Sequence, residues 1–224
     1  MRSLEDLLAA SSWTQGLTPE QLQRVRTTTI VRDFAAEAVV CHPGDPANVW
    51  VGVIEGLVRM VSESPSGKSM TFAALPTGSW FGEGSVLKRE LRKHSVIAVR
   101  QSRIAFLPEA TFFWLLDSSI AFNRFLLVQL NERLGHFMSF VEHERLLEPD
   151  ARVARSLAAM FNPQLYPGSK RQIELSQEEL GRIVGASRQS ISQSLQALEK
   201  AKLIKVDYRM ITVLNIAGLR RFGA

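Results

Sequence analysis

The stretch that decides the fold is Leu175–Leu203, which reads LSQEELGRIVGASRQSISQSLQALEKAKL. It predicts two short helices joined by a tight turn. Ser176 can cap the first helix, and Glu179, three residues later, completes a capping box. Gly185 can take the left-handed backbone that often ends a helix, and Ser187 can cap the second helix.

The second predicted helix has one apolar face and one polar face. Ile191, Leu195 and Leu198 have the spacing of a buried stripe. The remaining polar positions near its start are Arg188, Gln189, Ser192, Gln193 and Gln196. Arginine can bond guanine O6 and N7, and glutamine can bond adenine N6 and N7, so this face suits the DNA major groove. The alternative is an ordinary helical hairpin with a solvated face.

Charge is unevenly distributed along the chain, although the net charge of the 224 residues is only +5. Residues 151–224 contain 12 Lys and Arg against 5 Asp and Glu, whereas residues 1–150 contain 15 against 17. A basic C-terminal segment on a slightly acidic remainder is typical of a nucleic-acid-binding module attached to another domain.

Two classes of protein are not expected from the composition. No apolar run approaches 18 residues, and the N-terminus lacks the apolar core of a signal peptide, so we expect no membrane contact. Cys41 is the single cysteine, so neither an internal disulfide nor a four-cysteine iron–sulfur cluster is expected. A cytoplasmic location fits both features.

The first half of the chain predicts a β domain with helices at its ends. Residues 1–27 are predicted to be mostly helical, with a second helix starting at Thr18-Pro19-Glu20. Seven or more short β-rich runs follow from Thr28, separated by turn signals such as HPGDPAN and SPSGK. Such spacing predicts a compact sandwich or barrel. A helix is predicted next, over EATFFWLLD, and Trp50, Trp80 and Trp114 are expected in the core.

A long helix is predicted over residues 119–147. Its apolar residues repeat every seven positions, with further residues between them, and the expected seam is Ile120, Leu127, Leu130, Leu134, Phe137 and Val141. Two parallel helices bury such a seam against each other, which predicts a homodimer. The alternative is that the helix packs along its own β domain. Phe125, Leu126 and Met138 lie off the seam and are expected to meet that domain.

The DNA-binding part is predicted to begin after Glu148-Pro149-Asp150. A helix over Ala151–Phe161 and an exposed loop over Asn162–Arg171 precede the helix pair. Residues 203–213 then predict a strand, a turn and a strand, which is a small β wing. The cations Lys202, Lys205 and Arg209 are expected to meet DNA phosphates.

This order of elements resembles the CRP/FNR family of bacterial transcription regulators. The resemblance covers nearly the whole chain and is most specific in GASRQSISQSLQALEKAKLI and GSWFGEGSVL, with CHPGD and VIEGLVRM matching turns of the family's β-roll. It implies an α+β fold with an N-terminal antiparallel, jelly-roll-like β-roll and a C-terminal winged helix-turn-helix. The implied domains are an effector-sensing domain (1–118), a dimerisation helix (119–147) and a DNA-binding domain (148–224).

The resemblance also implies roles for individual residues in DNA recognition. The family's recognition helix usually begins Ser-Arg-Glu-Thr, with a second Arg four residues after the Glu. Here Arg188 keeps the first arginine, but Gln189 and Gln193 replace the glutamate and the second arginine. Because glutamine pairs with adenine and glutamate with cytosine, the half-site is expected to depart from the family's usual sequence.

An effector site is implied by the same resemblance. Gly82, Glu83 and Gly84 match the start of the family's phosphate cassette. The family's Arg-Ser pair aligns with Lys93-His94, flanked by Arg92 and Ser95, and its adenine-reading polar pair aligns with Phe137-Met138. Lysine is a point charge and the apolar pair offers no hydrogen bonds, so cyclic AMP is not expected as the effector. The cationic stretch 88–94 could hold another anion or be a solvated loop.

No residues suggest catalysis, a zinc site or a Walker loop. Cys41, His42, His136 and His143 raise a haem hypothesis that no ligand spacing supports. We therefore predict a non-enzymatic, homodimeric regulator that binds inverted-repeat double-stranded DNA, with RNA polymerase as a further candidate partner. Its effector is one other than cyclic AMP, or absent. The competing function is a nucleotide-type sensor that acts through protein contacts and binds DNA only nonspecifically.

Overall fold

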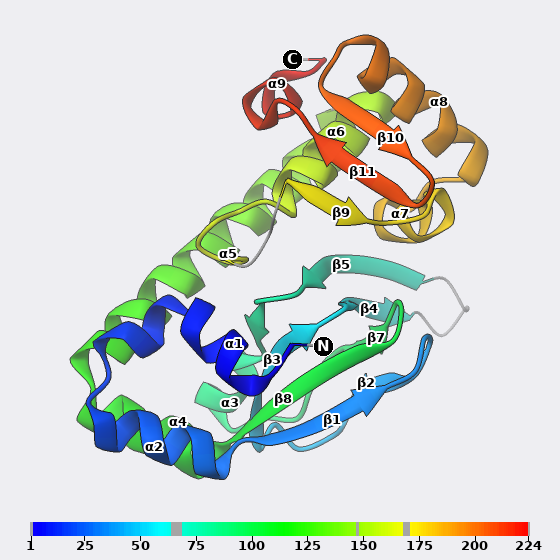
Figure 1. Cartoon of the computed structure of the whole chain (residues 1–224). Coiled ribbons are helices and arrows are strands. Elements are labelled where there is room, and N and C mark those ends of the chain that lie inside the picture. Colours follow the sequence, from blue (N-terminus) through cyan, green and yellow to red (C-terminus); the bar gives the residue numbers. More distant parts are fainter. Residues whose placement is uncertain (1, 64–68, 147, 168–170, 224) are drawn as a thin grey trace.

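The computed structural model describes residues 2–63, 69–146, 148–167 and 171–223. A β domain and a C-terminal, mainly helical domain lie one above the other in Figure 1, and the long helix α5 (Ile120–Leu146) runs along one side of both. The fold is the α+β arrangement expected from the sequence.

Short helices open the chain, as predicted. They are α1 (Leu4–Ala10), the 3-10 helix η1 (Ser12–Gly16) and α2 (Pro19–Thr28). The Thr18 side chain accepts a hydrogen bond from Gln21 N, and the Gln21 side chain accepts one from Thr18 N, which completes a capping box before Pro19 at the first helical position.

Among the described residues, eight strands build the β-roll in two antiparallel sheets. One sheet has the order β1-β8-β3-β6 and the other β2-β7-β4-β5. The strands are β1 (Ile30–Phe34), β2 (Val39–Cys41), β3 (Val49–Glu55), β4 (Leu57–Glu63), β5 (Ser69–Pro76), β6 (Trp80–Phe81), β7 (Ser95–Ala98) and β8 (Ser102–Pro108). The short helix α3 (Glu83–Lys88) follows β6, and α4 (Glu109–Ser118) follows β8.

An aromatic cluster joins the N-terminal helices, the roll and the start of α5. The Trp50 and Trp80 rings are stacked with their centroids 4.4 Å apart. The centroid of the Trp13 ring lies 5.3 Å from each of them. Phe122 of α5 packs edge-on against Trp13 and Trp50. The expected core positions of Trp50 and Trp80 are confirmed, whereas Trp114 is only partly buried, beneath the Arg24 guanidinium.

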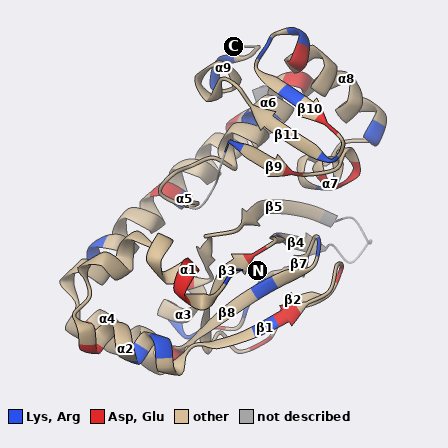
Figure 2. Ribbon diagram, viewed as in Figure 1, with Lys and Arg blue, Asp and Glu red and all other residues tan. Residues whose placement is uncertain are grey.

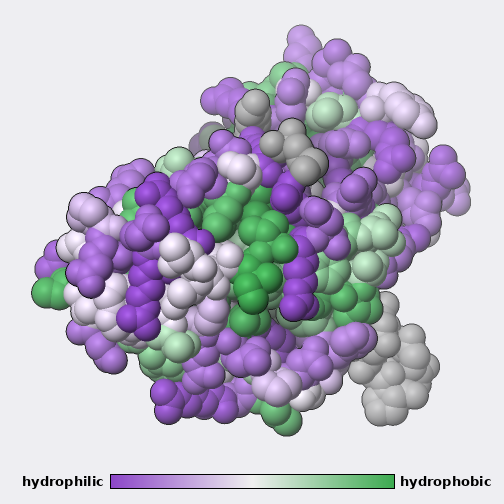
Figure 3. All heavy atoms as spheres, turned by 60° about the horizontal axis from the view of Figure 1, so that its bottom comes forward, coloured by the Kyte–Doolittle hydropathy of each residue, from purple (hydrophilic) through white to green (hydrophobic). Residues whose placement is uncertain are grey.

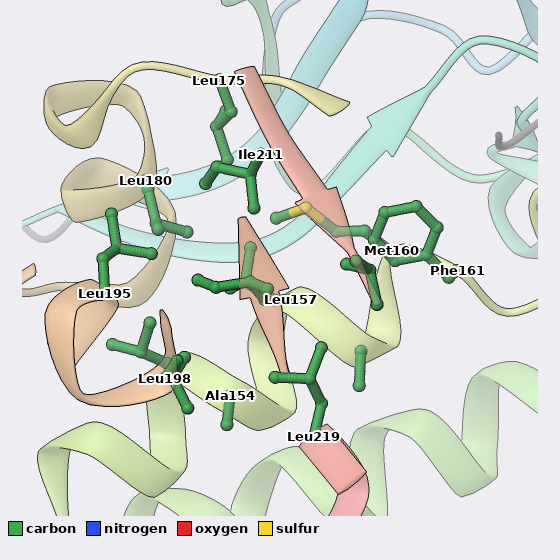
Figure 4. Close-up of a cluster of buried hydrophobic side chains, with 14 of the residues drawn as sticks. Ala154, Leu157, Met160, Phe161, Leu175, Leu180, Leu195, Leu198, Ile211 and Leu219 are labelled. Carbon is green, nitrogen blue, oxygen red and sulfur yellow. The ribbon is translucent and has the colours of Figure 1, made fainter. Parts of the chain in front are cut away.

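The C-terminal domain combines helices with a three-stranded sheet of order β10-β11-β9. Its elements are α6 (Pro149–Ala159), β9 (Gln172–Glu174), α7 (Gln177–Val184), α8 (Arg188–Lys200), β10 (Ile204–Asp207), β11 (Met210–Val213) and α9 (Ile216–Arg221). Figure 4 shows Leu157 of α6 among Leu180, Leu195, Leu198 and Ile211, which come from both predicted helices and the wing. The wing is confirmed, and β9 is a third strand that the sequence did not reveal.

One prediction in this domain is wrong. The segment Asn162–Arg171 was expected to be an exposed loop because it contains two prolines and a glycine, yet Leu165 is only 2% and Tyr166 only 3% exposed. Both side chains belong to the hydrophobic cluster inside the β-roll. Burial of their apolar surface outweighs the turn preference of the neighbouring residues.

Further contacts attach the C-terminal domain to the roll. The Thr71 hydroxyl on β5 donates to the carbonyl of Arg182 on α7, at 2.9 Å. The Arg182 guanidinium pairs with Glu37 at 2.7 Å, and Arg100 pairs with Glu174 at 3.3 Å. The two domains are therefore joined at more than one point in this structure.

Helix α5 exposes a row of apolar side chains. The exposed fractions are 72% for Ile120, 69% for Leu127, 57% for Leu134 and 53% for Phe137. By contrast, Leu126 is 3% exposed and Phe125 is partly buried in the aromatic cluster, as expected for the face toward the roll. Met138, also expected there, is 64% exposed, which corrects that prediction.

Other apolar side chains reach the surface outside α5, among them Ile30, Val39 and Leu91 of the roll. Figure 3 shows a mainly hydrophilic face with a band of hydrophobic residues across its middle. Within the described ranges, no single helix is long and apolar enough to cross a membrane. Glu109–Ser118 and Ile120–Glu142 meet the criteria of length and apolar composition only as a pair, which is bent by 110°.

Candidate DNA interface and effector site

The turn between α7 and α8 is set by two glycines. Gly185 has φ +71°, the left-handed conformation predicted for it. A Cβ at Gly181 would lie 2.7 Å from the carbonyl oxygen of Ala186, so only glycine allows this close approach. The Ser176–Glu179 capping box is present: Glu179 N donates to Ser176 Oγ at 3.1 Å, and Ser176 N donates to Glu179 Oε2 at 2.6 Å. The sequence analysis overlooked Gly181, because a glycine inside a helix shows its role only once the turn is seen.

Hydrogen bonds hold α8 at its start, middle and end. The Ser187 side chain accepts from Ser190 N, as predicted for its cap. The Ser194 hydroxyl donates to Asp150 of α6 at 2.6 Å. Glu199 accepts from Val206 N at 2.9 Å, so the one carboxylate on this helix is tied to the wing. These bonds fix the helix relative to the domain core and leave its outer face unengaged.

The outer face of α8 presents the predicted recognition residues. Arg188, Gln189 and Gln193 are exposed and Ser192 is half-buried. In the described part of the chain, none of the side chains of Arg188, Gln189 and Gln193 has a hydrogen-bond or ion-pair partner. In Figure 2, α8 lies at the outer edge of the molecule, away from the roll. The outer face of this helix is therefore accessible to a large ligand such as DNA.

The three predicted phosphate-binding cations are on the surface, two on the wing and one between α8 and the wing. Lys202 is exposed with φ +56° at the end of α8. Lys205 pairs with Asp207 at 3.0 Å, and Arg209 lies 3.9 Å from Glu179. The exposed Lys205–Asp207 pair contributes about 0–1 kcal/mol, so it leaves Lys205 available to phosphates. Arg209 is itself exposed, although Glu179 is buried.

The candidate effector site gathers around the start of α3. Gly82 caps this helix with φ +87°, and Gly84 lies in its first turn. Glu83 is 2% exposed, and its Oε1 accepts from Nε of Arg133 on α5 at 2.5 Å. Arg133 also donates to the carbonyl of Trp80 at 2.6 Å. Arg133 could not be predicted as a site residue, because a single arginine on a long predicted helix gives no local signal.

Arg92, rather than Lys93, is the cation that faces the cassette. The Arg92 side chain is buried and donates to the Val49 carbonyl at 2.6 Å. A Cβ at Gly82 would lie 2.6 Å from its Nη1. Lys93 is exposed and pairs with Glu90 at 3.2 Å. The geometry therefore favours Arg92 over Lys93 as the counterpart of the family's arginine, one position earlier than the sequence alignment suggested.

The remaining effector candidates lie apart from Gly82. The His94 ring packs 4.7 Å from the Phe72 ring, and burial, with a smaller contribution from Lys93, lowers the pKa of this imidazole. Ser95 begins β7. Phe137 and Met138 are exposed on α5 and so do not line the roll of this chain. Gly82, Glu83, Arg92 and Arg133 are the residues that the fold brings together.

A cavity of about 560 Å³ opens nearby, between β5, α5 and α6. Its walls include the cations Arg155 and Arg220, together with His136, Ser139 and Tyr166. None of the effector residues predicted from the sequence lines it.

A haem or metal site receives no support from the placement of the candidate ligands. His42 is exposed in a turn, and Cys41 is buried in the roll, where burial raises the pKa of its thiol. His136 lies on α5, and the side chain of His143 is outside the described residues. Among the described residues, no three His, Cys, Asp or Glu side chains are grouped as metal ligands.

A β-roll that precedes a helix-turn-helix with an exposed polar helix defines a DNA-binding transcription regulator with a sensor-type domain. Residues 31–119 match the cyclic nucleotide-binding domain family, and residues 151–222 match the Crp-like helix-turn-helix domain family. The chain belongs to the CRP/FNR family of DNA-binding transcription regulators, which are not enzymes.

Similar proteins cover most of the chain. The cAMP-activated global transcriptional regulator CRP of Haemophilus influenzae is 26% identical over 80% of this chain and 82% of its own length. The cAMP-activated global transcriptional regulator Vfr of Pseudomonas aeruginosa is 28% identical over 82% of this chain and 89% of its own. The structure of FixK2 from Bradyrhizobium japonicum superimposes with a TM-score of 0.72, at 18% identity, over 88% of this chain and 98% of that one.

Proposed function

We propose that this chain is a cytoplasmic homodimer that binds an inverted repeat in double-stranded DNA and regulates transcription there. The observation that carries the proposal is the exposed apolar row on α5, with Leu127 69% and Leu134 57% exposed. Burying a large apolar side chain stabilises by about 1.5–3 kcal/mol, and a second α5 with the same seven-residue repeat offers a matching surface. A two-fold dimer places two copies of α8 against two half-sites, about 34 Å apart.

Base recognition is assigned to the unengaged face of α8. Arg188 would bond guanine, whereas Gln189 and Gln193 would bond adenine. Ser187 and Ser192 would complete the interface on the helix, and Lys202, Lys205 and Arg209 would bind phosphates. RNA polymerase is the further partner that a DNA-bound transcription regulator of this kind would contact.

Cyclic AMP is not the effector that we propose, although the relatives cited above are named for it. Arg92, not Lys93, is the cation beside Gly82, so an anionic ligand would not need Lys93. Tyr166 packs in the roll cluster, so the docked tyrosine leaves cyclic AMP no room there. Calorimetry with cyclic AMP should show no binding below the millimolar range. Micromolar binding coupled to tighter DNA binding would contradict this part of the proposal.

The ratio of operator affinity to random-DNA affinity, measured together with the salt dependence, separates specific regulation from nonspecific binding. For a dimer that reads bases, a selected operator should be bound about 10³-fold or more tighter than random DNA at physiological salt. A sensor that binds DNA only nonspecifically should bind both sequences equally, with affinity that falls steeply with salt. Equal affinities would therefore refute the proposed function.

A further inference from the structure

Two side chains of the C-terminal domain occupy the interior of the β-roll. Leu165 and Tyr166 follow α6, are 2% and 3% exposed, and pack in one cluster with roll residues. The roll members of that cluster include Val51, Val53, Leu75, Phe81, Val96 and Ile104, from five strands. The position that a sensor domain would use for a small molecule is thus filled by the chain itself.

A compact turn holds the two side chains in place. Asn162 Oδ1 accepts from Gln164 N at 2.9 Å and from Leu165 N at 3.1 Å, and Tyr166 N donates to the Asn162 carbonyl at 2.8 Å. Asn162 Nδ2 donates to Glu132 of α5 at 3.0 Å. The turn is therefore tied to the long helix as well as inserted in the roll.

One buried polar atom with spare bonding capacity belongs to a residue that interacts electrostatically with the tyrosine. Glu83 and Arg133 are within electrostatic range of Tyr166, and burial is the main cause that raises the pKa of its phenol. Glu83 uses Oε1 to bind Arg133, but in the described part of the chain its buried Oε2 has no hydrogen-bond partner. A buried acceptor without a partner keeps the full cost of its desolvation, so a ligand hydroxyl that reached it would gain a strong contact.

We propose that the interior of the β-roll is a site for a small neutral aromatic molecule with a hydroxyl group, and that Tyr166 is its built-in occupant. The apolar strands would receive the ring, and Glu83 Oε2 would accept from the hydroxyl. A free ligand and Tyr166 exclude each other, so ligand binding releases the C-terminal domain from the roll. Only the DNA readout of this inference rests on the proposed function.

Competition between Tyr166 and a free ligand can be measured as a change in ligand affinity. A short tether gives Tyr166 an effective concentration of about millimolar, which a free ligand must overcome. By linkage, a change that weakens docking of Tyr166 tightens binding of the free ligand, at most by the factor by which the docked tyrosine weakened it. Removing the ring should therefore expose a site that the unaltered chain conceals.

The probe for this site is 4-methylphenol, which reproduces the tyrosine side chain. Calorimetry should show that Tyr166→Ala binds it about tenfold or more tighter than the wild type, because the competing ring is gone. Tyr208→Ala is the matched control, since Tyr208 is the second tyrosine and is 93% exposed on the wing. It should bind the probe as weakly as the wild type. Equal affinity of all three proteins, or no binding to Tyr166→Ala, would overturn the site.

Two further measurements keep the test decisive. If Tyr166→Ala does not fold, Tyr166→Leu keeps the apolar bulk but lacks the ring and should give the same ordering. In the wild type, hydrogen exchange should show a protected Tyr166 amide that loses protection as the probe approaches saturation. An amide that is unprotected from the start would refute the docked tyrosine without reference to any ligand.

The DNA readout tests release separately. Tyr166→Ala should differ from the wild type in operator affinity by about fivefold or more and should not respond to 4-methylphenol. Wild-type affinity should move toward the variant's value as the probe is added. Tighter probe binding by the variant with unchanged operator affinity would refute release. If the wild type bound no operator, the proposed function would fail, while calorimetry would still decide the site.

Discussion

Leu134 on α5 provides the sharpest test of the dimer. Its side chain is 57% exposed in the single chain, so about half of its surface remains to be buried. At about 1.5–3 kcal/mol for a fully buried leucine, two copies contribute roughly 2–3 kcal/mol to a symmetric dimer. Leu134→Ala should therefore weaken dimerisation by about 30- to 150-fold, at 1.4 kcal/mol per tenfold change. Leu134→Asp should weaken it further, because it places an unpaired charge in the seam.

Sedimentation velocity over a range of protein concentrations measures this change. The control is Leu91→Ala, because Leu91 has a similar exposure of 59% but lies in the loop before β7 and not on α5. We expect the wild type and Leu91→Ala to be dimers at micromolar concentration and Leu134→Asp to be a monomer that has lost operator affinity. A wild type that sediments as a monomer at that concentration would refute the account of α5.

Three further predictions concern single residues. Gly181→Ala should destabilise the fold by about 1–3 kcal/mol, because the added Cβ would lie 2.7 Å from the carbonyl oxygen of Ala186. Gly84→Ala is the control and should not destabilise the fold, because nothing lies within 4 Å of a Cβ there. Thermal unfolding of both variants measures the difference. Burial lowers the pKa of His94, so the folded state resists protonation of this imidazole. The free energy of unfolding should therefore fall as the pH drops below about 6.5. Urea unfolding at pH 7.5 and at pH 5.5 measures this fall, which should be smaller in His94→Gln. Lys202→Ala and Lys205→Ala should weaken binding to all DNA sequences alike and reduce the salt slope by about one each, and a slope equal to that of the wild type would contradict their phosphate contacts.

Local patterns predicted the elements of the fold well. The helix start at Thr18-Pro19, the capping box at Ser176, the left-handed Gly185 and the Ser187 cap each depend on residues a few positions apart, and each is present. The apolar spacing of Ile191, Leu195 and Leu198 likewise identified the buried face of α8. Such signals are short-range, so the sequence contains them in full.

Contacts between distant segments were not predictable in the same way. Tyr166 is buried against strands more than 50 residues earlier, although its neighbours favour a turn. Arg133 meets Glu83 across 50 residues, and the choice between Arg92 and Lys93 depended on a one-residue shift that only the fold decides. The chain packing, not the local pattern, determines which polar groups meet at the effector site.

Selection of bound sequences from random DNA, carried out with the wild type and with Arg188→Ala, tests the central claim most directly. We expect the wild type to enrich an inverted repeat with half-site centres about 34 Å apart and a fixed guanine in each half. Arg188→Ala should bind the selected site about 1–3 kcal/mol more weakly and lose preference at that guanine alone. Enrichment of no common sequence, or an unchanged guanine preference in Arg188→Ala, would contradict the assignment of α8 as the helix that reads DNA.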